Sequence, residues 1–177
     1  WNARVAQRDT VYIVGDFAWR DHNRYLARLR GKKILIRGNH DKMPQESLRN
    51  FTEVHDLLTR TIAGRFVVFC HYCMTVWRAS CHGAWHLYGH SHGRIRETQD
   101  NPRCDVGVDV WDFKPVPWEA VDLKLRPRQK CLSGDLADLD VNVRENQEAN
   151  RSVRNALTGQ SIDFAGGTQE PDLPDDE

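Results

Sequence analysis

Aspartate, asparagine and histidine recur in the first part of the chain, each time directly after a short apolar run. The residues concerned are Asp16, Asn39, His40, Asp41, His71, His90 and His92. Carboxylate, amide and imidazole groups together suit borderline divalent ions such as Mn, Fe or Zn, whereas Ca and Mg prefer shells of oxygen alone. These residue types therefore predict a metal site, provided that the fold brings them together.

The last two histidines lie in the stretch GHSH, residues 89–92, where one serine separates them. Residues two positions apart project to the same side of an extended backbone. If this stretch is extended, one imidazole can reach each of two neighbouring ions.

The apolar runs before the polar residues are predicted to be buried strands. They are residues 10–14, 32–37, 65–70 and 85–88, with a fifth strand expected at 105–110. In open sheets of α/β domains, ligands gather outside the carboxyl ends of the strands, because the sheet aims the loop side chains at one crevice. The order of the runs therefore predicts an α/β fold with its site at one sheet edge.

Helices are expected between the strands. Asp21 can cap a helix that ends at Gly31, and a short helix or turn is expected at 44–50. The segment after Pro117 is either a short helix or a return strand, and residues 51–62 leave both structures open.

Charge divides the chain into a basic body and an acidic tail. Residues 1–126 are long enough for one compact domain and carry 20 Lys and Arg against 14 Asp and Glu. This body tolerates substrates that bear phosphate, but its basic residues do not cluster as they do in a nucleic-acid interface. Residues 127–177 carry 5 Lys and Arg against 11 Asp and Glu. Because this tail has too little apolar surface to offset the entropy of ordering, it is predicted to be disordered apart from a transient helix at 136–157.

Five cysteines without a regular spacing favour free thiols in a reducing compartment, so a cytoplasmic location is expected. No apolar run approaches the ~20 residues that span a bilayer. Neither a membrane nor an obligate protein partner is therefore expected.

Three motifs and one histidine follow each other in a fixed order: GDFA at 15–18, GNHD at 38–41, His71, and GHSH at 89–92. In this combination the sequence resembles the calcineurin-like metallophosphoesterases, over roughly residues 10–125 and most of all their compact bacterial or phage branch. The resemblance implies a four-layer α/β/β/α sandwich. It also implies hydrolysis of phosphate mono- or diesters by a water activated at a site of two divalent ions, with Mn, Fe or Zn expected. Small molecules, nucleotides and nucleic acids that carry phosphate are all substrates within that range.

The resemblance assigns a metal-binding role to five side chains. It implies that Asp16 bridges the two ions, that Asn39, His71 and His90 complete the shell of the second ion, and that His92 serves the first.

Two further residues receive catalytic roles from the same resemblance. His40 corresponds to the acid that protonates the leaving oxygen, and Asp41 would orient His40 and support its charged form.

The family's first motif, an Asp-x-His on a strand before the GD, has no counterpart in residues 1–14. We expect a chain truncated at its amino terminus, in which residues 1–9 end a helix and one central strand is missing. The second ion keeps four ligands, whereas the first keeps only Asp16 and His92, so one stable ion is expected rather than two. The alternatives to an enzyme are a metal-binding fragment without catalysis and a nucleic-acid-binding module.

Other candidate residues have simpler explanations. His86 alternates with apolar neighbours along a strand and is expected to be structural. Cys70, Cys73 and Cys81 do not make a zinc knot, since no second CxxC exists. Three arginines near the loops, Arg20, Arg37 and Arg78, are able to hold a phosphate, but most arginines of the body serve solubility. The six tryptophans are expected to pack in the core and loops rather than to form a base-stacking platform.

Overall fold

The computed structural model describes residues 1–98 and 101–128. The chain divides into two units, Trp1–Gly134 and Asp135–Glu177, and the second unit lies outside the described residues. The predicted disorder and transient helix of the tail therefore lie outside them too. The folded part includes Arg128, two residues beyond the expected boundary at 126. Arg128 is buried, and its Nη1 donates to Glu97 Oε2 at 3.1 Å.

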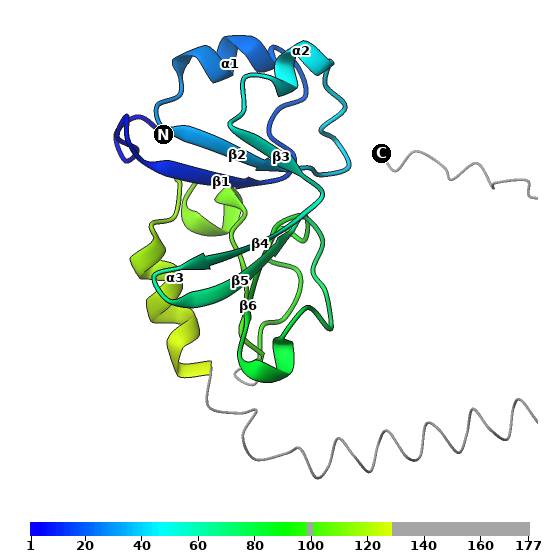
Figure 1. Cartoon of the computed structure of the whole chain (residues 1–177), viewed down its shortest axis with the longest axis vertical. Helices are drawn as coiled ribbons and strands as arrows, with labels where there is room; N and C mark the ends of the chain where they lie inside the picture. Colours follow the sequence, from blue (N-terminus) through cyan, green and yellow to red (C-terminus); the bar gives the residue numbers. More distant parts are fainter. Residues whose placement is uncertain (99–100, 129–177) are drawn as a thin grey trace, which may run out of the picture. The chain divides into compact units, whose positions relative to one another are not determined.

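The structure is a mixed α/β fold with two sheets (Figure 1). Sheet A is parallel in the order β1-β2-β3 and pairs Val14 with Ile36 at its carboxyl end. Its strands are β1 (Thr10–Val14), β2 (Lys32–Ile36) and β3 (Glu53–His55).

Sheet B has the order β4-β5-β6-β7, and only its β4–β5 pair is antiparallel. Ala63 and Gly64 connect these two strands with φ angles of 47° and 79°, which are the left-handed values of a two-residue hairpin turn. The strands of the sheet are β4 (Leu57–Ile62), β5 (Arg65–Cys70), β6 (Trp85–Tyr88) and β7 (Arg103–Asp105).

The main core lies between the two sheets. Ile34 and Ile36 of β2 share one buried cluster with Val67 and Phe69 of β5 and with residues of β6. Tyr12 of β1 stacks on Phe69 with ring centroids 4.6 Å apart. Strand alternation explains this, because every second side chain of β2 and β5 faces the other sheet.

Helices α1 (His22–Arg28) and α2 (Gln45–Leu48) lie over the outer face of sheet A (Figure 1). Leu26 of α1 packs there with Leu35 and Phe51. The outer face of sheet B packs against Trp77 and Ala84 of the segment between β5 and β6, which contains the 3₁₀ helix η1 (Ser80–His82). Within the described residues, α1 and α2 therefore cover the outer face of sheet A, and the segment between β5 and β6 covers the outer face of sheet B.

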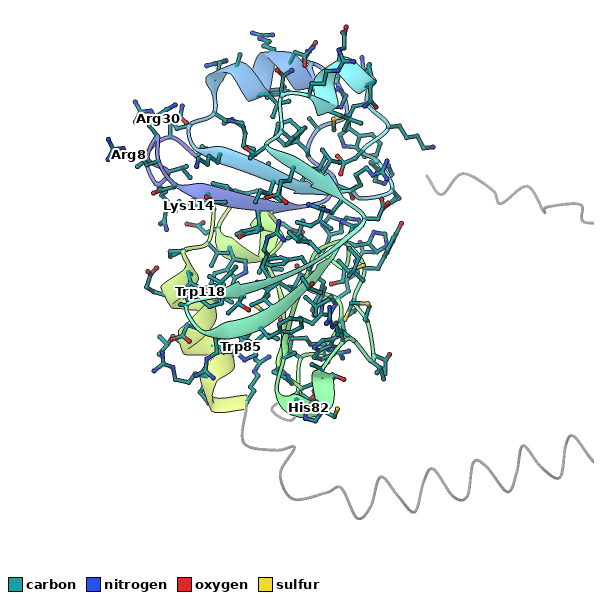
Figure 2. The ribbon with its side chains drawn as sticks, viewed as in Figure 1. Arg8, Arg30, His82, Trp85, Lys114 and Trp118 are labelled. Carbon is teal, nitrogen blue, oxygen red and sulfur yellow. The ribbon has the colours of Figure 1, made fainter. Side chains whose placement is uncertain are left out.

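Helix α3 (Trp118–Leu125) adds to the core between the sheets. Val121 and Leu125 are buried there, and Trp118 stacks on Trp85 of β6 with ring centroids 5.5 Å apart (Figure 2).

Several local predictions need correction. Residues 103–105 form β7, but 108–111 form the 3₁₀ helix η2 (Val108–Trp111), so the strand expected at 105–110 is wrong beyond Asp105. The side chain of Asp21 makes no capping hydrogen bond, because its φ of 56° is left-handed rather than that of a usual N-cap. Residues 1–9 form turns rather than the end of a helix. Residues 51–62, for which the sequence left helix and strand undecided, contain β3 and β4.

Among the described residues, β1 pairs only with β2. A cleft of about 1280 Å³ runs along β1 and reaches Asp16; apolar residues of the other sheet, among them Phe69 and Leu87, line it as well. No helix among the described residues is long and apolar enough to span a membrane.

Candidate metal centre

Four strand ends supply the candidate ligands. Asp16 follows β1, Asn39 follows β2, His71 follows β5 and His90 follows β6. β1 is parallel to β2 and β5 is parallel to β6, so the carboxyl ends of each pair point the same way. The structure brings these four side chains together around His71.

His71 is at the centre of the group and is 1% exposed. Its Nε2 lies 3.1 Å from Asn39 Oδ1, 3.2 Å from His90 Nδ1 and 3.3 Å from Asp16 Oδ2. Ligand atoms of Asp16, His71 and His90 all lie within 4.8 Å of one another. Two ligand atoms that each lie about 2 Å from one ion are about 3 to 4 Å apart, so this spacing suits a shared ion.

The protons of this group support a cation rather than a simple hydrogen-bond network. His71 Nδ1 lies 2.9 Å from the carbonyl oxygen of Val14, so Nδ1 carries a proton and donates it there. Nε2 then presents its lone pair to the Asn39 oxygen and the Asp16 carboxylate, which are acceptors as well. A proton on Nε2 could form a good hydrogen bond with only one of these acceptors, whereas a divalent ion attracts all of them. The donor set of carboxylate, amide and imidazole therefore fits a divalent metal ion.

Two glycines allow the loops to approach this closely. A Cβ on Gly15 would lie 2.0 Å from His71 Nδ1, and a Cβ on Gly38 would lie 2.3 Å from Asp16 Oδ1. Gly15 also has a φ of 83°, which side chains of L-residues rarely adopt. The glycines of the GD and GN motifs are thus needed by the geometry of the site.

The surroundings of His90 favour its neutral form. Burial lowers the pKa of His90, and the nearby His71, His92 and His40 lower it further, while the Asp16 carboxylate raises it. Because the net pKa is lowered, the neutral imidazole that a metal requires is favoured.

Asp41 positions the site loops instead of orienting His40. Its Oδ2 accepts hydrogen bonds from the backbone N–H groups of Asp16 and Gly38, and its Oδ1 accepts one from Phe17, all at 2.8 Å. None of the hydrogen bonds found for the described residues joins Asp41 to the ring of His40. The role expected for Asp41 is therefore corrected: it clamps the GD loop to the GNHD loop.

His40 lies beside the group around His71. Its backbone N–H donates to Asp16 Oδ1 at 3.1 Å, and its ring contacts Trp19 with centroids 4.1 Å apart. The ring is half-buried, and no hydrogen bond to its nitrogen atoms is found among residues 1–98 and 101–128. Trp19 is a neighbour that sequence reasoning missed, although it stands only three positions after Asp16.

The GHSH stretch is not extended, so His92 does not project to the same side as His90. Both histidines have left-handed φ angles, 61° for His90 and 49° for His92, because the segment turns and the Ser91 N–H donates to Gly89 O at 2.5 Å. His92 is not part of the group around His71. Its Nδ1 lies 2.5 Å from Asp109 Oδ2, a partner that the sequence analysis did not identify.

The pairing with Asp109 still leaves His92 suited to a metal. A carboxylate on Nδ1 fixes the proton there and leaves Nε2 with its lone pair, as in carboxylate–histidine–metal arrangements. His71 uses the Val14 carbonyl in the same way. The signal in the sequence was Asp109 in GVDVWD, which lies in η2, four residues after the end of β7.

Asp105, a buried aspartate that the sequence analysis did not identify, holds the turn at residues 89–93. Asp105 Oδ2 accepts hydrogen bonds from Ser91 Oγ at 2.7 Å and from the Gly93 N–H at 3.0 Å, and Asp105 Oδ1 accepts one from the Gly107 N–H at 2.9 Å. The carboxylate at the end of β7 thus fixes the loop that carries His90 and His92.

The residues that were set aside have structural partners. His86 is fully buried; its Nδ1 donates to Val68 O and its Nε2 accepts from the Met74 N–H, both at 3.1 Å. Cys70, Cys73 and Cys81 are free thiols. The His86 interpretation is confirmed, because both ring nitrogens are used within the fold.

Two of the three arginines are already engaged. Arg37 forms two hydrogen bonds with Asp56 at 2.8 and 2.7 Å, and the Arg78 guanidinium lies over the Phe66 ring. Arg20 is exposed, and no ion pair to it is found within the described residues.

The fold and the site define a mixed α/β protein with a candidate metal centre at its strand ends. No family model matches the chain. The chain belongs to the family of the "Gene 66 protein" of Mycobacterium phage D29, to which it is 30% identical over 151 residues, with 66% of this chain and 75% of that protein covered. Its fold is similar to that of "the Protein of Unknown Function AQ665 from Aquifex aeolicus", with a TM-score of 0.53 and 24% identity over 69% of this chain and 79% of that one.

Proposed function

We propose that the protein is a metal-dependent phosphoesterase of the calcineurin-like type. The observation that carries this proposal is the meeting of three possible metal ligands, from Asn39, His90 and Asp16, around the Nε2 atom of the buried His71. The order of these residues along the chain and the placement of each behind its own strand agree with the motifs of that class.

Each side chain has a distinct task in the proposed reaction. Asp16, Asn39, His71 and His90 would hold the ion, which when bound supplies positive charge for the phosphate and lowers the pKa of a water toward neutrality. His40 stands beside them, where it can donate a proton to the leaving oxygen. Asp41 keeps the loops of Asp16 and His40 in register through its three backbone hydrogen bonds.

The described residues support one ion more strongly than two. The group around His71 offers four ligands, whereas a neighbouring ion would have Asp16 and His92 alone, with Asp109 orienting His92. A metal-binding protein without hydrolytic activity is therefore the second candidate. Both candidates bind the metal, but only the phosphoesterase hydrolyses a phosphate ester.

The test combines hydrolysis with metal binding. Aryl phosphate mono- and diesters are offered to the chain with added Mn²⁺, and thermal unfolding is followed with and without Mn²⁺. We expect hydrolysis and a higher Tm with Mn²⁺, because a ligand that binds only the folded state stabilises it.

Asp16→Ala is expected to abolish both effects, and Asp56→Ala serves as the control, since Asp56 is an exposed partner of Arg37 outside the group. A Tm shift without hydrolysis would favour the second candidate. Hydrolysis that survives Asp16→Ala would contradict the proposed site.

A further inference from the structure

Trp19 is an exposed residue of the loop after β1 and is not part of the core. It is 76% exposed, while the other five tryptophans are buried or half-buried. Its indole lies against the ring of His40, with ring centroids 4.1 Å apart and an angle of 43° between the planes. Trp19 therefore does not pack in the core, and its ring contact is with His40 of a neighbouring loop.

The position of Trp19 beside His40 places its ring near the leaving group of a substrate. On the proposed function, on which this inference rests, His40 protonates the oxygen of the leaving group. The alcohol that carries this oxygen must therefore pass beside His40, and Trp19 is the ring in contact with His40. Tyr72 is the other exposed aromatic residue at the site. Its ring centroid lies 5.1 Å from that of His71 and 4.8 Å from that of His90, so Tyr72 lies next to the candidate metal ligands and not next to His40.

An open indole face next to the leaving group favours a flat, aromatic leaving group. Every nucleobase has a π-face that stacks on such a ring, whereas a sugar phosphate without a base offers none. Trp19 and Arg20 line the cleft of about 1280 Å³ that also contains Asp16, which is more than the volume of most small-ligand sites. Space beside Trp19 therefore does not limit a nucleoside.

We propose that the substrate is a nucleotide whose phosphate is held at the His71 group and whose base stacks on Trp19. One indole face beside His40 fits one base, so the occupant is a mononucleotide rather than a longer strand. Trp19 would thus decide which phosphate esters are preferred.

Binding of a matched pair of ligands tests this inference without requiring turnover. Adenosine 5′-monophosphate and ribose 5-phosphate share the same phosphate ester and differ in the base. Titration calorimetry on the Mn²⁺-loaded protein is expected to give a Kd roughly tenfold to a hundredfold lower for the nucleotide, the range that stacking of one base provides. Equal Kd values for the two ligands would overturn the proposal.

Variants then assign the preference to Trp19. Trp19→Ala is expected to reduce the ratio of the two Kd values to near one, and Trp19→Phe to keep most of it. Phe113→Ala removes an aromatic ring of similar exposure, 78%, and is expected to leave the ratio as it is. A merely structural role, in which Trp19 only supports His40, would weaken both ligands equally in Trp19→Ala, and that outcome contradicts the proposal.

The remaining outcomes separate this inference from the proposed function. If neither ligand is hydrolysed but the nucleotide still binds more tightly through Trp19, base recognition stands and the enzymatic proposal fails. If both ligands are hydrolysed with equal kcat/KM and equal Kd, the enzymatic proposal stands and base recognition fails. If a ten-residue single-stranded oligonucleotide binds at least a hundredfold more tightly than the mononucleotide and with a steep dependence on salt, the occupant is a nucleic acid and the mononucleotide is wrong.

Discussion

Two buried aspartates, Asp41 and Asp105, hold the loops that carry the candidate ligands. Each accepts three hydrogen bonds through its side-chain oxygens, Asp41 from the loops after β1 and β2, and Asp105 largely from the turn after β6. A buried carboxylate is stable only when such donors surround it. Aspartate is therefore needed at these two positions for the precision of the site, even though neither residue belongs to the group around His71.

Gly15→Ala tests how closely the loops must approach. The added Cβ would lie 2.0 Å from His71 Nδ1, so the imidazole must move and lose its hydrogen bond to Val14 O. We expect the free energy of unfolding to fall by about 1 to 3 kcal/mol and the affinity for Mn²⁺ to fall at least about tenfold, measured by urea unfolding and titration calorimetry.

Gly64→Ala is a matched control for this change. Gly64 has nearly the same φ, 79° against 83°, but an added Cβ there meets no atom within 4 Å. It therefore carries the backbone strain without the clash, and its affinity for Mn²⁺ is expected to stay normal. Equal losses of Mn²⁺ affinity in both variants would show that strain, and not the displacement of His71, is responsible.

At the scale of elements, helix α3 contributes to the fold through one face. Val121 and Leu125 enter the core between the sheets, and Trp118 stacks on Trp85. Leu123 of the same helix is 78% exposed. The strands β5 and β6, which end at His71 and His90, share this core, so α3 helps to fix two of the ligand-bearing strands.

Replacing Leu125 by alanine tests this contribution. Leu125 has no exposed surface, and its truncation leaves a cavity in the main core. The free energy of unfolding is expected to drop by about 2 to 5 kcal/mol, as judged from urea unfolding. Leu123→Ala makes the same chemical change on the exposed face and is expected to alter it by less than about 0.5 kcal/mol. Similar losses in the two variants would contradict the core-packing role of Leu125, because Leu→Ala costs nothing in helix propensity at either position.

At the scale of the whole molecule, one buried histidine links unfolding to pH. Burial lowers the pKa of His86, the backbone hydrogen bonds of its ring partly oppose this, and the charge of Arg103 lowers it further. In the unfolded chain the pKa is about 6.5. Between the lowered folded pKa and about 6.5, the unfolded state binds the additional proton, so the stability rises with pH through this window and is complete above it.

Urea unfolding between pH 8 and pH 5 measures this linkage. Below about pH 6.5 we expect the wild-type protein to lose stability by up to about 1.4 kcal/mol per pH unit through His86. His86→Gln removes this proton while it keeps a polar group for Val68 O and the Met74 N–H. His90 titrates in both proteins, so the difference between them isolates His86. A pH dependence that is the same in both proteins would refute the assignment.

Much of the fold could be predicted from the sequence because strands with buried faces have a simple pattern. The apolar runs that end before Asp16, Asn39, His71 and His90 are β1, β2, β5 and β6, within one residue at their ends. The conformation of the segment after β7 was less predictable. The run at 105–110 has apolar alternation, yet Gly107 and the interactions of Asp105 turn the chain into η2 after β7.

The sequence by itself determined which residue types follow which strands, and therefore the candidate ligands of the site. Only the tertiary structure decided what each polar side chain does there. It directed Asp41 to three backbone amides, paired His92 with Asp109 and left Trp19 exposed beside His40. The physical reason is that periodicity encodes burial along one segment, whereas the partners of a carboxylate or an imidazole come from loops that are distant in sequence and meet only when the two sheets pack.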